Sequence, residues 1–252
     1  MCLLVVASRV VPGTPVLVGA NRDEFLSRPA VSAVVLRADT PRIIGGRDEQ
    51  SGGTWLAVNQ HGVFAGLTNQ PLGEERDATK RTRGELPLAL ASQDTAARSV
   101  DHFLDHYSPT DYNGSYLLVG DRDDLFFIDF TGTVEPAALA LPPGVHVLEN
   151  RPLGSSSPKT DHVGTSLGQL TGDVADDLAT MRMVLSDHHI ADITRERPET
   201  SANCVHMDEF GTRSSCIVRV PGEQPSAPQV WVAAGSPCNA PFEDVGHLWQ
   251  GS

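Results

Sequence analysis

Two short apolar runs rich in β-branched residues open the chain and support its first structural prediction. Residues 2–10 and 16–20 flank a Pro-Gly-Thr-Pro turn at 12–15. Apolar runs on either side of such a turn are typical of a β-hairpin. Because a hairpin pairs its first residue with its last, Cys2 is expected to lie beside residues 21–24 at one end of two neighbouring strands.

Further along the chain, apolar runs separated by glycine, proline and acidic turns predict more strands. The runs expected to be strands are residues 33–37, 41–48, 51–58, 61–69, 113–120, 124–130, 144–148, 213–220 and 229–234. Many follow one another through hairpin-sized turns, which favours antiparallel pairing.

Helical spacing of apolar residues is confined to fewer segments. Residues 82–91 and 94–104 predict two consecutive helices, and residues 173–186 predict a third, whereas 158–172 indicate loop and short helix. The third helix has an apolar face made by Val174, Leu178, Met181 and Leu185.

The order of these elements is strands, helices, strands, a helix and strands again. This order indicates an α+β fold in which helices cover antiparallel sheets, and disfavours a parallel doubly wound sheet. No linker-like tract divides the 252 residues, so we expect a single domain over residues 1–252.

The net charge of −13 disfavours nucleic acid and anionic membranes as partners, because phosphate binding needs clustered lysines and arginines. The one basic run, residues 80–83, is flanked by acidic residues and is expected to be a solvated turn. No apolar run is long enough for a membrane span, and the N-terminal run lacks the features of a signal peptide. We therefore expect a soluble, cytoplasmic protein.

The four cysteines are widely spaced and contain no C-x-x-C pair. They are expected to be free thiols, with Cys204, Cys216 and Cys238 as buried packing residues. The adjacent histidines His188 and His189 should point apart, which disfavours a metal site there. No metal and no cofactor are predicted.

Cys2 has a special chemistry if Met1 is removed. A cysteine at the chain end carries a thiol nucleophile and an α-amine, whose unperturbed pKa of about 7.7 to 8.0 suits a general base. A Met-Cys start also occurs by chance, so the signal gains weight only from the residues around it.

A set of short motifs accompanies Cys2. They are Ala20-Asn21-Arg22-Asp23-Glu24-Phe25, Arg28-Pro29, Gly45-Gly46-Arg47-Asp48, Gly53-Thr54-Trp55-Leu56, Leu67-Thr68-Asn69, Arg83-Gly84-Glu85-Leu86 and Gly211-Thr212-Arg213-Ser214-Ser215. With them the chain closely resembles the NRDE family, also called the transport and Golgi organisation family. The motifs are dense over residues 1–86 and sparse beyond.

The resemblance implies an N-terminal nucleophile hydrolase fold, a four-layer αββα sandwich. Within that superfamily the chain is similar to the branch of bile-salt hydrolases, penicillin V acylases and acyl-coenzyme A:6-aminopenicillanate acyltransferase, whose mature chains begin with cysteine. Two late segments, Cys204-Val205-His206 and Gly235-Ser236-Pro237-Cys238, resemble the acyltransferase-like subgroup.

The same resemblance implies roles for six residues. Cys2 is the nucleophile, and Arg22 and Asp23 match in type an Arg and an Asp on the strand beside it. The spacing departs from the branch pattern, so Asn21 and Glu24 remain candidates for those two places.

Three later residues complete the set. Asn69 resembles an oxyanion-hole asparagine, Asn150 a second active-site asparagine, and Arg213 a late arginine that holds the α-amine or polar groups of the substrate. Simpler roles stay open, because Asn69 and Asn150 could be turn residues and Arg213 a surface charge. Arg22 and Asp23 could form a structural ion pair, and Trp55 is expected to be core before substrate platform.

The favoured function is a cysteine amidohydrolase that cleaves a small-molecule N-acyl amide other than a peptide bond through an acyl-enzyme. Hydrolysis and acyl transfer both remain open, as do the acyl group, the amine and the oligomeric state, including a homo-oligomer. Eukaryotic NRDE members are associated with lipid homeostasis and haem trafficking, which implies a non-catalytic carrier as the alternative. A retained Met1 would favour that carrier, and a peptidase is a third interpretation.

Overall fold

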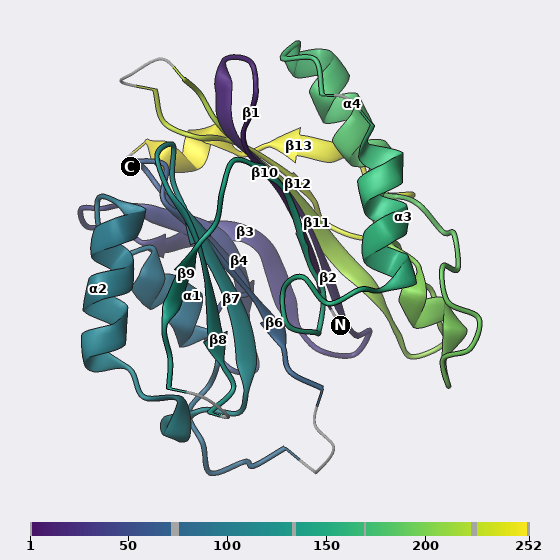
Figure 1. The fold of residues 1–252 in the computed structure, drawn as a ribbon, viewed down its shortest axis with the longest axis horizontal. Helices are drawn as coiled ribbons and strands as arrows, with labels where there is room; N and C mark the ends of the chain where they lie inside the picture. The colour runs from purple at the N-terminus through teal and green to yellow at the C-terminus, as the bar shows by residue number, and fades with distance from the viewer. Residues whose placement is uncertain (1, 72–75, 133–134, 169, 223–225, 251–252) are drawn as a thin grey trace.

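The computed structural model describes residues 2–71, 76–132, 135–168, 170–222 and 226–250. Within these residues, two antiparallel sheets pack face to face and helices cover their outer faces (Figure 1). The predicted α+β class and the four-layer αββα arrangement are confirmed.

The first sheet contains the predicted N-terminal hairpin. Its strands, in spatial order, are β10 (Gly144–Leu148), β1 (Cys2–Val11), β2 (Thr14–Phe25), β11 (Phe210–Val220), β12 (Gln229–Ala233) and β13 (Phe242–Asp244). In the β1–β2 register, Cys2 pairs directly with Arg22. The prediction that residues 21–24 lie beside Cys2 is therefore confirmed, and β2 extends through them to Phe25.

The second sheet follows the chain from strand to strand. Its members, in order, are β3 (Ala30–Arg37), β4 (Ile43–Asp48), β5 (Leu56–Asn59), β6 (Phe64–Asn69), β7 (Ser115–Gly120), β8 (Leu125–Phe130) and β9 (Ala138–Ala140). The two short edge strands β9 and β13 were not predicted, because three residues are too few to show an alternating pattern.

Two pairs of helices form the outer layers. They are α1 (Glu85–Leu90) and α2 (Ala96–His106) on the second sheet, and α3 (Pro158–Leu167) and α4 (Val174–Leu185) on the first. The predicted apolar face of α4 is confirmed by its packing against the first sheet. Residues 158–167, expected to be loop and short helix, form a ten-residue helix that Ser157 caps by accepting a hydrogen bond from the Thr160 N–H.

Side chains of β1 alternate between two apolar layers. Leu4 and Val6 belong to the core between the sheets, whereas Leu3 and Val5 pack against α3 and α4. A strand buried on both faces has a continuous apolar sequence, as this one does. Since Cys2 has the parity of Leu4, its side chain faces the space between the two sheets.

No helix among the described residues is long and apolar enough to cross a membrane.

Candidate active site

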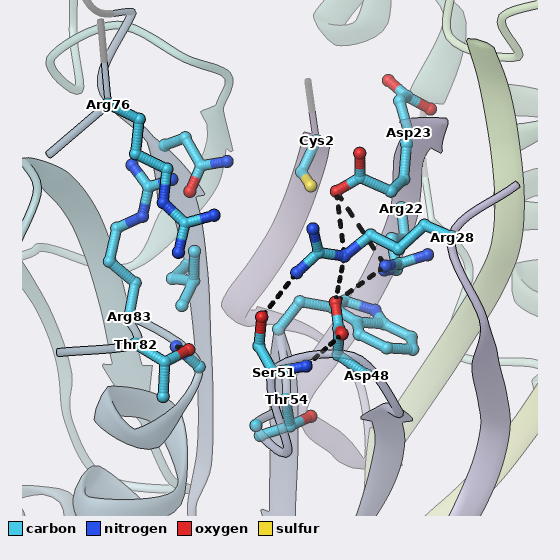
Figure 2. Close-up of a pocket in the computed structure, with 16 residues that line it drawn as sticks. Cys2, Arg22, Asp23, Arg28, Asp48, Ser51, Thr54, Arg76, Thr82 and Arg83 are labelled. Atoms are coloured by element: carbon cyan, nitrogen blue, oxygen red, sulfur yellow. Dashed lines mark hydrogen bonds and ion pairs between the residues drawn. The ribbon is translucent and has the colours of Figure 1, made fainter. Parts of the chain in front are cut away.

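Cys2 lines a pocket that residues of both sheets form (Figure 2). One wall comes from β2 and the segment around Asp48, and the facing wall comes from the segment just before α1. Burial raises the pKa of the Cys2 thiol, while the backbone amide of Asp23 and the charge of Arg22 favour the thiolate. A thiol in this position needs a base before it can attack a carbonyl group.

Asn150 connects the backbone of Cys2 to the second sheet. Its Oδ1 accepts a hydrogen bond from the backbone N–H of Cys2 at 3.0 Å, and its Nδ2 donates to the carbonyl oxygen of Asn69. Asn150 is 5% exposed. The two predicted asparagines are thus brought together beside the nucleophile, in contrast to solvated turn residues.

Asn69 ends β6, and its side chain lines the pocket with that of Cys2. The approach of β6 to Asn150 is reinforced by Thr68, whose hydroxyl donates to the carbonyl oxygen of Glu149 at 2.9 Å. A side-chain amide at this place can donate to an oxyanion that develops on a bound carbonyl group.

Arg22 lies across from Cys2 on the neighbouring strand. Its guanidinium packs over the ring of Trp55 at 4.7 Å and donates to Asp48 at 3.1 Å. One nitrogen, Nη1, is buried without a hydrogen-bond partner among the described residues. Trp55, expected to be core, contacts the inter-sheet core and also lines the pocket beneath Arg22.

Asp23 is 3% exposed and accepts a hydrogen bond from the Thr212 hydroxyl at 2.6 Å. Burial raises the pKa of Asp23, and nearby positive charge, including that of Lys159, opposes this rise. The ion pairs of Arg22 within the described chain go to Asp48 and to Glu24. Of the two alternative candidates, Asn21 donates to the carbonyl oxygens of Leu185 and Asn203 and does not line the pocket, whereas Glu24 does line it.

Lys159 was missed by the sequence analysis. This residue of α3 is 1% exposed, and its ammonium group donates to the Ala202 carbonyl oxygen at 2.8 Å. Burial lowers the pKa of Lys159, and the nearby carboxylates of Asp23 and Glu149 oppose that effect. Nothing in the surrounding sequence distinguishes Lys159 from a surface lysine, because its environment is made by distant segments.

Arg28 and Asp48 form the polar floor beside Arg22 (Figure 2). Arg28 donates to Asp48 at 2.6 Å and to the Ser51 hydroxyl at 2.7 Å. Burial alone would raise the pKa of Asp48, but the hydrogen bond from Arg28 and those from the backbone hold it below its ordinary value. The Arg-Pro and Gly-Gly-Arg-Asp motifs were the available signal for this pair.

Two further arginines, Arg76 and Arg83, lie together on the facing wall (Figure 2). Arg83 arrives there because Gly53 and Gly84 touch backbone to backbone, where a Cβ on Gly53 would lie 2.5 Å from the Gly84 Cα. Burial and the like charge of Arg76 lower the pKa of Arg83 to about 10. Neither arginine forms an ion pair with a carboxylate of the described residues.

Arg213 does not line the pocket, and within the described chain it makes no hydrogen bond to Cys2. It sits in the irregular part of the β2–β11 pairing, where the register shifts between Thr212 and Ser214. Its guanidinium reaches the carbonyl oxygen of Arg28 at 3.5 Å. The structure thus brings together the other five predicted residues, whereas Arg213 lies outside the pocket lining and contacts the backbone of Arg28.

Comparison with known proteins identifies the family. Residues 1–226 match the sequence model described as Transport and Golgi organisation 2. The chain belongs to this family. A Transport and Golgi organization protein 2 homolog from Bos taurus is 30% identical over 239 residues, which cover 81% of each chain. The Homo sapiens homolog is 33% identical over 144 residues, 53% of this chain and 50% of its own.

The fold of this Transport and Golgi organisation 2 family member is also similar to that of a solved amidase. The Caenorhabditis elegans N-acylethanolamine-hydrolyzing acid amidase ortholog superimposes with a TM-score of 0.54 at 15% identity. The match covers 89% of this chain and 95% of the other. The family member therefore has the N-terminal nucleophile hydrolase fold that its motifs predict.

Proposed function

We propose that removal of Met1 makes this protein a cysteine amidohydrolase that cleaves a linear, non-peptide N-acyl amide through an acyl-enzyme. The observation that carries the proposal is the position of the Cys2 backbone nitrogen, held by Asn150 at 3.0 Å while the thiol faces a polar pocket. Met1 itself lies outside the described residues. Once Met1 is removed, the nitrogen that Asn150 holds becomes an α-amine. This amine can act as the general base that the Cys2 thiol needs, because the raised pKa of the thiol keeps it protonated.

In the first half-reaction the thiol proton passes to the α-amine, and the thiolate attacks the carbonyl carbon of the amide. Asn69 donates to the oxygen that becomes negative, a contribution of roughly 3 to 4 kcal/mol at comparable sites. The tetrahedral intermediate collapses as its C–N bond breaks, and the α-ammonium returns the proton to the leaving amine. A thioester of Cys2 remains.

In the second half-reaction a water molecule gives a proton to the α-amine and attacks the thioester carbon. The C–S bond breaks, the acid is released, and the proton restores the Cys2 thiol. An amine or thiol in place of water would make the same site an acyltransferase, since the steps are otherwise identical.

The arginine pair on the facing wall favours substrates with an anionic group. Replacing Arg83 by Gln should raise KM about 10-fold for an N-acyl amide that carries a carboxylate, because hydrogen bonds to charged groups contribute about 1.5 to 3 kcal/mol. The kcat for that substrate and both constants for a neutral amide should change little. Arg98→Gln, on the exposed surface of α2, is the matched control. An equal rise in KM for the neutral and the anionic amide would argue against anion recognition by Arg83.

Asn150→Asp tests the role of the held nitrogen. A carboxylate beside the α-amine favours the ammonium form and so raises the amine pKa, which leaves less free base at neutral pH. We expect kcat/KM at pH 7 to fall by about 10²-fold and the rising limb of the pH–rate profile to move to higher pH. Asn150→Ala should lose activity without that movement. An unshifted profile in Asn150→Asp would remove the α-amine from the mechanism.

The overall proposal is tested with purified full-length protein. The C. elegans protein is named for hydrolysing N-acylethanolamines, so the panel holds an N-acylethanolamine, fluorogenic N-acyl amides of several chain lengths and a dipeptide. The expected result is an intact mass without Met1, release of amine from an N-acyl amide, and a mass increase by one acyl group. A retained Met1 without any acyl adduct would instead support a carrier, and turnover of the dipeptide alone would support a peptidase.

A further inference from the structure

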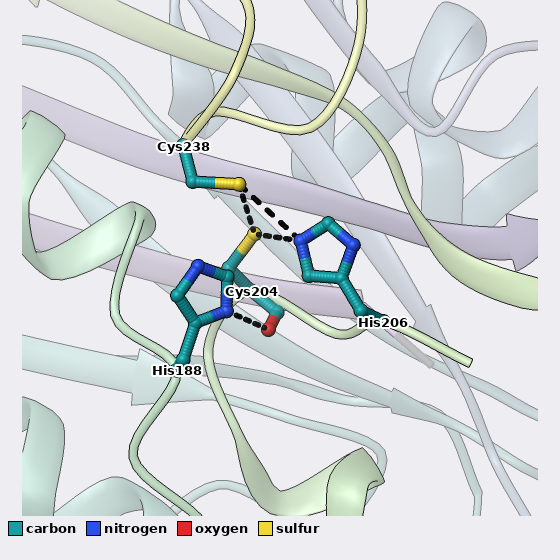
Figure 3. A group of neighbouring side chains, drawn as sticks. All are labelled: His188, Cys204, His206 and Cys238. Atoms are coloured by element: carbon teal, nitrogen blue, oxygen red, sulfur yellow. Dashed lines mark hydrogen bonds between the residues drawn. The ribbon is translucent and has the colours of Figure 1, made fainter.

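Four side chains that commonly bind transition metals lie close together, and none of them lines the Cys2 pocket (Figure 3). They are His188, Cys204, His206 and Cys238. The first follows α4, the next two precede β11, and the last lies between β12 and β13. We propose that this cluster binds one zinc ion.

The distances between the ligand atoms are those of a tetrahedral site. With Zn–S near 2.3 Å and Zn–N near 2.0 to 2.1 Å, a tetrahedron has S···S edges of about 3.8 Å and S···N edges of about 3.5 Å. The sulfur atoms of Cys204 and Cys238 are 3.7 Å apart, and His206 Nε2 lies 3.5 Å and 3.3 Å from them. Three corners are therefore in place around one point.

His188 supplies the fourth corner. All four ligand atoms lie within 4.8 Å of one another, so His188 needs to move by only about 1 Å to reach a tetrahedral edge. Its Nδ1 lies 3.2 Å from the Cys204 carbonyl oxygen (Figure 3), which leaves Nε2 as the ring nitrogen to bind the metal. Such a bond to the backbone fixes the tautomer and orientation of a metal-bound histidine.

The choice of metal follows from the ligands. Two thiolates and two neutral imidazoles balance the charge of one Zn²⁺, and this soft, closed set is typical of structural zinc. Cys204 is buried, whereas Cys238 and both histidines are exposed, so an ion can enter from solvent. The expectation that Cys238 is a buried packing residue is therefore wrong.

The sequence predicts no metal site, because the cysteines form no C-x-x-C pair and the adjacent histidines His188 and His189 are expected to point apart. Its expectation that adjacent histidines diverge is nevertheless correct, since His189 stacks on His162 at 4.3 Å and His188 neighbours His206 at 5.0 Å. Only one histidine of the pair joins the cluster. The remaining ligands come from segments that only the fold brings together.

A zinc ion here would fix the segment behind Asp23. The Val205 N–H donates to the Thr212 hydroxyl at 2.9 Å, and that hydroxyl donates to Asp23. On the other side, the Ser236 hydroxyl donates to the Thr212 carbonyl oxygen at 2.8 Å. A metal that links Cys204 to Cys238 would hold the segments around Val205 and Ser236 against Thr212 of β11. The metal would therefore position Asp23 without contacting the substrate.

The test uses full-length protein, reduced, stripped with a chelator and then titrated with Zn²⁺ or Co²⁺ alone. We expect one zinc per chain by elemental analysis and, with Co²⁺, the intense visible bands of tetrahedral cobalt plus a thiolate charge-transfer band. Cys238→Ser should weaken zinc binding by about 100-fold or more, because structural zinc sites depend on all their ligands. Cys216→Ser, on β11, is the control and should bind as wild type does.

These readouts do not depend on enzymatic activity, so they stand apart from the amidohydrolase proposal. A fully reduced wild-type protein that binds no zinc would overturn the site, as would unchanged affinity in both Cys238→Ser and Cys204→Ser. The cluster would instead be a redox pair if the intact mass were two daltons low, peptide mapping located a Cys204–Cys238 disulfide, and the reduced protein bound no zinc.

Discussion

Replacing Cys2 by Ala or Ser is expected to lower kcat/KM for the best N-acyl amide by at least about 10³-fold, since the nucleophile acts as a unit with its base. The Ala variant has no nucleophile. The Ser variant keeps an α-amine but has a hydroxyl, which is far harder to deprotonate than a thiol. The measurement is steady-state kinetics together with intact mass after incubation with substrate, and no acyl adduct should form on the Cys2→Ala variant.

The fold should survive both changes, because Cys2 starts its strand and is only partly buried. Melting temperatures close to that of wild type would show this. Cys216→Ser serves as the thiol control and should keep both activity and the acyl adduct. Turnover by the Cys2→Ala variant at the wild-type rate would contradict the proposed mechanism outright.

Replacing Lys159 by Met should lower the free energy of unfolding by about 3 to 5 kcal/mol, the usual cost of removing one partner from a buried pair of charges. Lys159 is 1% exposed and its charge stabilises ionised Asp23. Methionine has a similar length and apolar stem, so the lost charge dominates over lost volume. Urea unfolding followed by fluorescence measures the change.

The pH dependence has a defined sign. Burial already raises the pKa of Asp23 above its ordinary value of 3.8, so the folded carboxyl keeps its proton to higher pH than the unfolded one. Such a group destabilises the fold progressively as pH rises through that window. Without the charge of Lys159, the pKa of Asp23 rises further. The loss of unfolding free energy relative to wild type should therefore be smaller near pH 4.5, where Asp23 can be protonated, than near pH 8.

A double variant separates charge from packing. Lys159→Met combined with Asp23→Asn removes both charges and keeps an oxygen for Thr212, so most of the lost stability should return. If the double variant is no more stable than Lys159→Met alone, the two groups do not interact and Lys159 acts through Ala202 or Glu149.

The part of this fold that the sequence predicts well is the set of strands that follow from apolar runs and turn residues. The apolar runs and the turn between them predict that Cys2 lies beside residues 21–24, and the observed register pairs it with Arg22. The asparagines could be nominated only through resemblance, because residues 69 and 150 meet across two sheets. Lys159 had no local signal, since its environment comes from segments far apart in sequence.

Arg213 shows what a motif alone does not predict. Its motif is intact, but the residue stands where the β2–β11 register shifts between Thr212 and Ser214, and it does not line the pocket. A single extra residue in one strand changes the face on which all later side chains appear. The residue between Thr212 and Ser214 is an arginine, so no proline or glycine at this point predicts the register shift.

The alternation of β1 also constrains the protein in a way that residue identity does not. Leu3 faces the helices and Leu4 faces the other sheet. Because side chains alternate along a strand, Cys2, two residues before Leu4, points to the same side as Leu4. A chain one residue longer ahead of Leu3 would keep every motif and the same cysteine, yet present its sulfur to the helix layer. In the proposed mechanism, the number of residues between Cys2 and the first core leucine therefore decides whether the sulfur faces the pocket.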